Sequence, residues 1–195
     1  MAGGIGAGKS SVAEILRSLG AAVVDSDRLA HEQLNDPQVA ATLERWWGPS
    51  VFASDGKIDP AAVAGIVFRN PAELQKLEDL LYPRIAVRRD ELMAKSEDDP
   101  RVRAIVIDAP KLFEAGVDKL CDAVIFVDAE PEVRAARVAA SRGWPREEWI
   151  RRENLQNPLD KKRTNADHVV ENHSSIEELR SKVEKVFSAV LAAFA

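Results

Sequence analysis

The chain has 195 residues, enough for one domain with a sizeable core and an insertion. Its 27 Lys and Arg against 32 Asp and Glu give a net charge of −5, which argues against a general nucleic-acid binder but allows a small anionic substrate. Hydrophobic residues make up 46% of the chain, which argues against disorder, and the single cysteine, Cys121, excludes an intrachain disulfide. No apolar run reaches the roughly 18 residues of a membrane helix, and no signal peptide is expected. We therefore expect a cytoplasmic protein that binds neither nucleic acid nor a membrane.

The first motif begins at the third residue. Residues 3–10 match G-x-x-x-x-G-K-[ST], the pattern of a loop that binds nucleotide phosphates. Glycines let backbone N–H groups converge on phosphate oxygens, Lys9 can reach the β- and γ-phosphates, and the Ser10 hydroxyl can bind Mg²⁺. Apolar residues at helical spacing over 12–19 predict a helix behind the loop, ended by Gly20. A flexible glycine turn before a helix is the alternative.

Only Met1 and Ala2 precede this motif, although a phosphate-binding loop of this type follows a strand in the middle of its sheet. We therefore expect the first core strand to be missing from this chain. A sheet without that strand would leave two edges facing a gap, which is costly.

Short apolar runs alternate with helical patterns along much of the chain. Strands are predicted over 21–24, 104–107 and 123–127, with a weaker one over 168–170. Buried strands that alternate with helices indicate an α/β fold, with a parallel sheet flanked by helices. Ligands of such sheets bind at the carboxyl ends of the strands.

Between the first two of these strands the pattern becomes helical and is broken by Gly, Pro and Asp. We interpret residues 28–99 as a helical insertion in a nucleotide-binding core formed by residues 1–27 and 100–195. A last helix is predicted to begin near Ser174, whose hydroxyl would form a capping box with Glu177.

Carboxylates stand at the ends of two predicted strands. Asp25 and Asp27 follow the strand at 21–24, where a carboxylate could accept or orient the proton of an attacking hydroxyl. Capping of a helix, or support of Mg²⁺ through water, is an equally open role. Asp108 ends the strand at 104–107 and could also support Mg²⁺ through water.

Basic residues are concentrated between about 134 and 155, where Gly143-Trp144-Pro145 separates two helical arms. A hinged basic arm is typical of a lid that closes over ATP and brings positive charge to the transferring phosphoryl group. The alternative is a solvated helix face, because interleaved glutamates can pair with the arginines. Lys161-Lys162-Arg163 is expected to be solvated surface, with a phosphate contact as the alternative. The arginines of the predicted lid are Arg134, Arg137, Arg142, Arg146, Arg151 and Arg152.

Taken in order, these motifs resemble the dephospho-CoA kinase family. The phosphate loop alone would be generic, but P-x-L-F-E at 110–114 and A-D-x-V-x-x-N at 166–172 make the resemblance specific, and it spans nearly the whole chain. It implies transfer of the ATP γ-phosphoryl group to the ribose 3′-hydroxyl of dephospho-CoA. It also implies a nucleotide-kinase-like core, a helical CoA-binding domain and a mobile lid. The matching segments are 3–11, 24–28, 55–59, 66–71, 77–83, 110–114, Gln156 and 166–172.

The resemblance implies roles for individual residues. Asp27 would be the catalytic base, assisted by Lys9 and Arg137, and Ser10 would bind Mg²⁺. An ordinary turn is the alternative role for Asn172-His173. ATP would be bound by Gly4, Ile5, Gly6, Ala7, Gly8, Lys9, Ser10, Ser11, Arg137, Arg142, Asn172 and His173. The acceptor substrate would be bound by Asp27, Tyr82, Pro110, Leu112, Phe113 and Glu114.

Two residues depart from the family pattern. Lys111 stands where the family usually has Leu, and Tyr82 stands where it usually has His. Tyr82 keeps a ring and a hydrogen bond but carries no charge near neutral pH. Both departures concern contacts with the acceptor and leave the phosphate loop unchanged.

Other functions fit part of the sequence. A kinase for a different small molecule or nucleotide would use the same core, and an inactive truncated homologue would explain the missing strand. A GTPase-type switch is disfavoured because residues 165–167 lack the lysine of the guanine-reading N-K-x-D motif. We expect a monomer that uses ATP and Mg²⁺.

Overall fold

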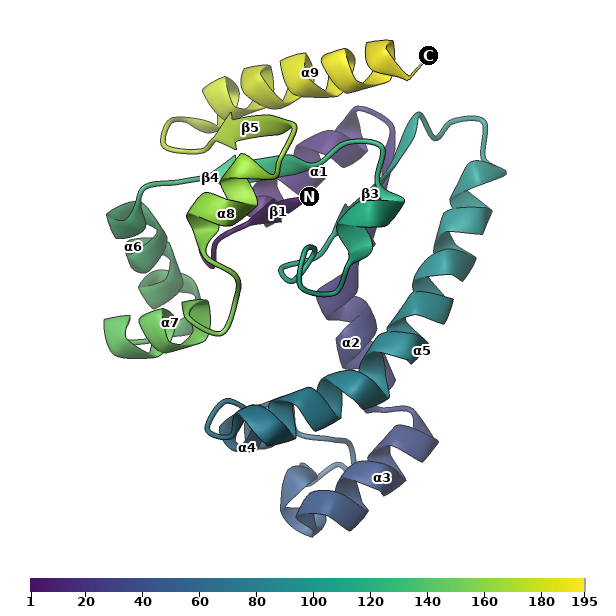
Figure 1. Cartoon of the computed structure of the whole chain (residues 1–195), viewed down its shortest axis with the longest axis vertical. Helices are drawn as coiled ribbons and strands as arrows, with labels where there is room; N and C mark the ends of the chain where they lie inside the picture. Colours follow the sequence, from purple (N-terminus) through teal and green to yellow (C-terminus); the bar gives the residue numbers. More distant parts are fainter. Residues whose placement is uncertain (195) are drawn as a thin grey trace. The chain divides into compact units, whose positions relative to one another are not determined.

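The computed structural model describes residues 1–194 and divides the chain into two compact units (Figure 1). The core unit combines Met1–Asp25 with the chain from Lys95 onward, and the helical unit is Ser26–Ala94. The second boundary falls inside a long helix, α5 (Pro71–Glu97).

All strands of the core unit run parallel. β1 (Ala2–Gly3), β4 (Ile125–Asp128) and β5 (His168–Glu171) form one hydrogen-bonded group, and β2 (Ala21–Asp25) and β3 (Ala104–Asp108) form another. Every strand predicted from an apolar run is present, with its end shifted by one residue toward the carboxylate that follows it. The predicted α/β fold with a parallel sheet is confirmed.

The expectation that the first core strand is missing is wrong. Ala2 and Gly3 pair in parallel with Phe126 and Val127 of β4, so a two-residue strand precedes the phosphate-binding motif. The backbone nitrogen of Met1 donates to the carbonyl of Ile107 at 2.6 Å, and the Met1 carbonyl accepts from the Ala109 amide at 3.4 Å. These bonds join the two groups of strands, because each residue of an extended chain can bond to both neighbours.

Helices cover the sheet of the core unit and close its apolar core. α1 (Lys9–Ser18) and α9 (Ile176–Ala193) pack against each other, and α9 lies beside β5 (Figure 1). Their apolar faces meet the strands in a buried cluster that includes Leu16, Val127, Val170 and Phe187. The remaining core-unit elements are η2 (Val117–Leu120), α6 (Pro131–Arg142), α7 (Arg146–Glu153) and α8 (Leu159–Thr164).

The cap of the last helix lies one residue beyond its predicted place. Ser175, rather than Ser174, is the N-cap of α9, and its hydroxyl accepts a hydrogen bond from the Glu178 amide at 3.3 Å. Two consecutive serines offer the same chemistry, so the register of the apolar stripe decides which of them caps the helix.

The helical unit has its own apolar core. Aspartates begin two of its helices: Asp36 accepts from two amides of the first turn of α3, and Asp59 accepts from one amide of α4. Val39, Leu43 and Val51 are fully buried in the cluster that these helices enclose. The elements are α2 (Ser26–Leu34), α3 (Pro37–Trp47), η1 (Pro49–Val51), α4 (Pro60–Val67) and most of α5.

Among residues 1–194, no helix is both long enough and apolar enough to cross a membrane.

Candidate active site

The phosphate-binding motif forms a tight loop that leads directly into α1. Gly8 is the N-cap of this helix at φ 89°, in the left-handed region where glycine is favoured. Among residues 1–194, no side chain caps the helix, and no acidic residue lies in its first turn. The free N–H groups, together with Lys9 and the exposed Ser10, therefore form a place where a phosphate is stabilised.

The carbonyl of Ala7 is held from outside the loop by two residues that the sequence selected as ATP contacts. Asn172, which is buried, donates from Nδ2 to this carbonyl at 2.8 Å. Arg137 donates to the same oxygen at 3.4 Å and to the Asn172 carbonyl at 3.1 Å. A Cβ on Gly8 would overlap Asn172 Nδ2, so a larger residue cannot fit without displacing this support.

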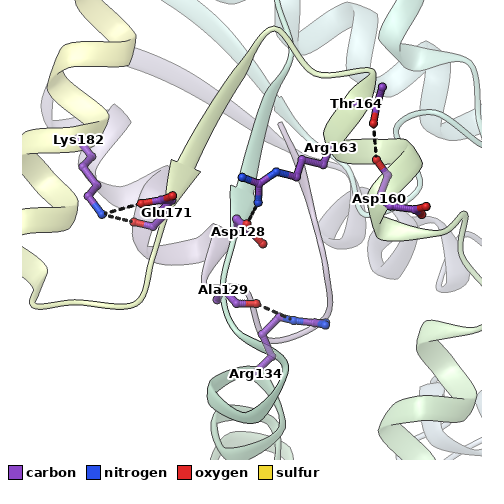
Figure 2. Close-up of polar contacts among 8 residues, drawn as sticks. All are labelled: Asp128, Ala129, Arg134, Asp160, Arg163, Thr164, Glu171 and Lys182. Atoms are coloured by element: carbon purple, nitrogen blue, oxygen red, sulfur yellow. Dashed lines mark hydrogen bonds and ion pairs between the residues drawn. The ribbon is translucent and has the colours of Figure 1, made fainter.

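The carbonyl of Ile5 is held by a second pair of donors. Arg134 Nη1 lies 3.4 Å from it and Trp149 Nε1 lies 3.3 Å from it. Arg134 also donates from Nε to the Ala129 carbonyl at 3.1 Å, which Figure 2 shows beside the end of β4. Its guanidinium lies over the Trp149 ring and forms an ion pair with Glu153. The helix α7 is thereby fastened to the phosphate-binding loop.

The outer arginines of the predicted lid contact residues of α6, of α7 and of the turn between them. Arg142 and Arg152 both stack on Trp144, at 4.9 Å and 4.0 Å from the ring centre. Arg152 and Arg151 also pair with Glu148, and Arg146 pairs with Glu132. Pairing with interleaved glutamates, the alternative considered from the sequence, therefore describes the exposed Arg146 and Arg151 and the half-buried Arg152, whereas Arg134 is buried.

The carboxylates at the strand ends lie in two places. Asp25 and Asp108 lie opposite each other as the last residues of the paired strands β2 and β3, at the carboxyl ends of these strands in the core unit. Asp27 is exposed in the first turn of α2, in the helical unit. Tyr82 also belongs to the helical unit, on α5.

The turn after β3 carries the rest of the predicted acceptor site. Leu112 is fully buried, while Pro110, Phe113 and Glu114 are half-buried. Asn172 is buried against the loop, as described above, whereas His173 beside it is exposed.

The expectation that Lys162 lies on a solvated surface is wrong. Only 1% of its side chain is exposed, because Glu114 and other oxygen acceptors compensate its charge. Burial lowers the pKa of the Lys162 ammonium, and the pairing with Glu114 opposes that effect. The sequence contains no signal that connects these two distant residues. Arg163, the next residue, is exposed and pairs with Asp128 at the end of β4 (Figure 2).

Known proteins match this chain over nearly its whole length. The family model for dephospho-CoA kinase matches residues 1–178. A dephospho-CoA kinase from Chlorobaculum tepidum is 37% identical, and the alignment covers 97% of this chain and 92% of that protein. The solved structure of TT1252 from Thermus thermophilus is 35% identical, with a TM-score of 0.79 over 100% of this chain and 95% of that one. A dephospho-CoA kinase from Campylobacter jejuni is 25% identical, with a TM-score of 0.71 over 100% and 96%.

The chain belongs to the dephospho-CoA kinase family. This confirms the family that the sequence motifs resemble, and it identifies the protein as a kinase. Two substitutions test how the phosphate-binding loop of this kinase is positioned and supported.

Gly8→Ala should impair nucleotide binding by more than its backbone strain explains. The added Cβ collides with Asn172 Nδ2, so the loop or its support must shift. We expect ATP affinity, measured by calorimetry, to fall by at least about tenfold, which is about 1.4 kcal/mol. Gly116→Ala is the matched control, because Gly116 has φ 66° and nothing within 4 Å of the added Cβ. Equal ATP affinities of the two variants would contradict the account.

Arg134→Met should destabilise the kinase strongly. It removes the donor to two backbone carbonyls and leaves Glu153 without its ion-pair partner, and breaking a buried pair costs about 3–5 kcal/mol. Chemical denaturation measures the change. Arg146→Met removes an arginine whose ion pair is exposed, and it should leave the unfolding midpoint nearly unchanged. A similar effect of both variants would refute the structural role of Arg134.

Proposed function

We propose that this kinase transfers the γ-phosphoryl group of ATP to the ribose 3′-hydroxyl of dephospho-CoA, giving coenzyme A and ADP. The observation that carries the proposal is the family match over residues 1–178, which includes the phosphate-binding loop and the turn after β3. The geometry of the loop supports the donor half of the reaction, because its helix N-terminus has neither a side-chain cap nor an acidic residue in its first turn.

ATP would be held mainly by residues 4–11. The backbone amides cradle the phosphates, Lys9 neutralises the β- and γ-phosphates, and such positioning is the main source of catalysis in phosphoryl transfer. Arg137 and Arg142 would add positive charge from the predicted lid. Asn172 and His173 would contact the adenine, which the position of Asn172 behind the loop supports.

The acceptor would be bound by the turn 110–114 and by the helical unit, with Tyr82 among its contacts. Asp27 would take the proton of the 3′-hydroxyl as the new O–P bond forms and the bond to ADP breaks. Its place in the first turn of α2, directly after the carboxyl end of β2, supports this role, since ligands of parallel sheets bind at the strand ends.

Mg²⁺ is part of the proposal, and the residues present fit it. Ser10 offers a hydroxyl at the start of α1, and Asp25 and Asp108 offer carboxylates at adjacent strand ends. The part of the chain that the structure describes has no group of three or more His, Cys, Asp or Glu that could hold a metal. Mg²⁺ needs only one or two protein ligands when phosphates and waters supply the others. When bound, it neutralises charge on the phosphates.

We further propose that the kinase works as a monomer in the cytoplasm, with small molecules as its partners. The net charge of −5 supports the exclusion of nucleic acid, since a polyanion would be repelled except at local basic patches.

The function is tested by incubating the 195-residue chain with ATP, Mg²⁺ and a panel of acceptors, followed by mass spectrometry. We expect a product of the mass of coenzyme A from dephospho-CoA, and no phosphorylated product from shikimate, gluconate or nucleoside monophosphates. A control without acceptor measures ATP hydrolysis. Phosphorylation of a different acceptor, with dephospho-CoA unchanged, would favour another small-molecule kinase on the same core.

Asp27→Asn should lower kcat by about 10²–10⁴-fold while ATP binding persists, because a general base contributes that much. Coupled detection of ADP measures turnover, and calorimetry measures ATP affinity. Glu32→Gln is the control, since Glu32 is an exposed carboxylate on the same helix. Undiminished turnover of the Asp27 variant would remove this residue from the mechanism.

A further inference from the structure

A buried ion pair joins segments of the core unit that the proposed reaction uses separately. Nζ of Lys162, in α8, lies 2.8 Å from the Pro110 carbonyl, 3.1 Å from Gln156 Oε1 and 2.8 Å from Glu114 Oε1. An ammonium group has three hydrogen-bond donors. Each donor therefore has an oxygen acceptor within the protein, and Lys162 has none left for a phosphate.

Glu114 connects the same segments from the other side. Its Oε1 also accepts a hydrogen bond from the Asn157 amide at 2.7 Å. Its Oε2 is buried and has no hydrogen-bond partner among residues 1–194. A buried pair with an unsatisfied oxygen contributes little stability beyond what apolar side chains of the same volume would provide. The geometry that the pair imposes is therefore its more important consequence.

The two segments lead to the two sides of the proposed reaction. Residues 110–114 form the turn that begins after Asp108 and Ala109, at the carboxyl end of β3, where ligands of parallel sheets bind. Gln156 and Asn157 follow α7, the helix that Trp149 fastens to the phosphate-binding loop. Lys162 and Glu114 therefore connect the 110–114 turn to Gln156 and Asn157, which we call the base of the lid because the predicted lid ends there.

We propose that Lys162 is a positioning residue for the acceptor substrate: through Glu114, Pro110 and Gln156 it holds the 110–114 turn in register with the base of the lid. The inference rests on the proposed function in naming dephospho-CoA as that acceptor. The loop that would bind ATP is supported by Asn172 and Arg137, whereas the hydrogen bonds and the ion pair of Lys162 go to Pro110, Gln156 and Glu114. Lys162 acts on the loop through charge repulsion with Lys9, which its removal would relieve. Loss of the pair should therefore weaken use of the acceptor far more than use of ATP.

The two members of the pair respond differently to burial: the pKa of the Lys162 ammonium is lowered by it, whereas that of Glu114 is held down by its hydrogen bonds. Burial alone would raise the pKa of the Glu114 carboxyl, but hydrogen bonds from Lys162 and the Asn157 amide outweigh it and hold the pKa below its usual value. Because the folded-state pKa is lowered, the stabilisation from Glu114 is present above the usual value and is lost as the pH falls through the folded-state pKa. Near neutral pH the carboxylate remains available to Lys162.

The decisive test compares Lys162→Met with the double variant Lys162→Met/Glu114→Gln. The single variant leaves a buried carboxylate unpaired and should lower the melting temperature, whereas the neutral double variant should regain most of that loss. In both variants we expect KM for dephospho-CoA to rise by about tenfold or more, with KM for ATP within about twofold of the wild type. Lys162→Met retains Glu114, so its effect on the acceptor KM does not come from loss of a contact that Glu114 itself makes. Lys161→Met, which changes the exposed neighbour on α8, should match the wild type in both constants.

Gln156→Leu provides a test that leaves the ion pair intact. It removes one of the three acceptors of Lys162 without leaving a carboxylate unpaired. It should raise KM for dephospho-CoA by about threefold, and it should lower the melting temperature less than Lys162→Met does. An unchanged acceptor KM in this variant, or an equal rise of both KM values in the double variant, would overturn the inference. Failure of the wild type to form coenzyme A would instead overturn the proposed function, so the two failures are distinguishable.

Discussion

The carbonyl groups of the phosphate-binding loop impose the constraint on which the rest of the core unit depends. A loop that directs its N–H groups toward an anion must direct carbonyl groups elsewhere, and a buried carbonyl without a donor costs about 1–3 kcal/mol. Within the loop, the Gly4 carbonyl accepts from the Ala7 amide at 3.1 Å, but the glycines supply no side chains for the other carbonyls. Donors reach Ala7 and Ile5 from distant segments; they are Asn172, Arg137, Arg134 and Trp149.

This requirement divides the arginines of one helix between two tasks. Arg134 and Arg137 stand one turn apart on α6 and both face the loop, where they bond to its backbone. Arg142, at the end of α6, stacks on Trp144 in the turn between the two arms. The first two arginines of the basic segment therefore support the loop, and its later arginines carry the remaining positive charge. Positive charge near the site and support of the loop have a common structural origin.

Local patterns predicted most of the core, because short apolar runs and the glycine-rich motif each specify a structure without distant partners. The two-residue first strand could not be predicted, since its existence depends on bonds from Met1 to β3 and on pairing with β4. For the site, sequence selected Asn172 and Arg137 as residues near the nucleotide. It contained no information on which side of the loop they would lie, because that depends on how β5 and α6 meet the loop in three dimensions.

The three adjacent cations of α8 show why a charge run cannot be assigned as a unit. Successive residues of a helix point about 100° apart, so neighbours meet different surroundings. Lys161 is exposed, Lys162 is buried against Glu114, and Arg163 reaches Asp128 at the end of β4 (Figure 2). One short helix thus connects to the turn after β3 and to the carboxyl end of β4 through separate ion pairs. Since these strand ends are where a parallel sheet binds its ligands, the ion pairs of α8 hold the backbone on which the proposed site is built.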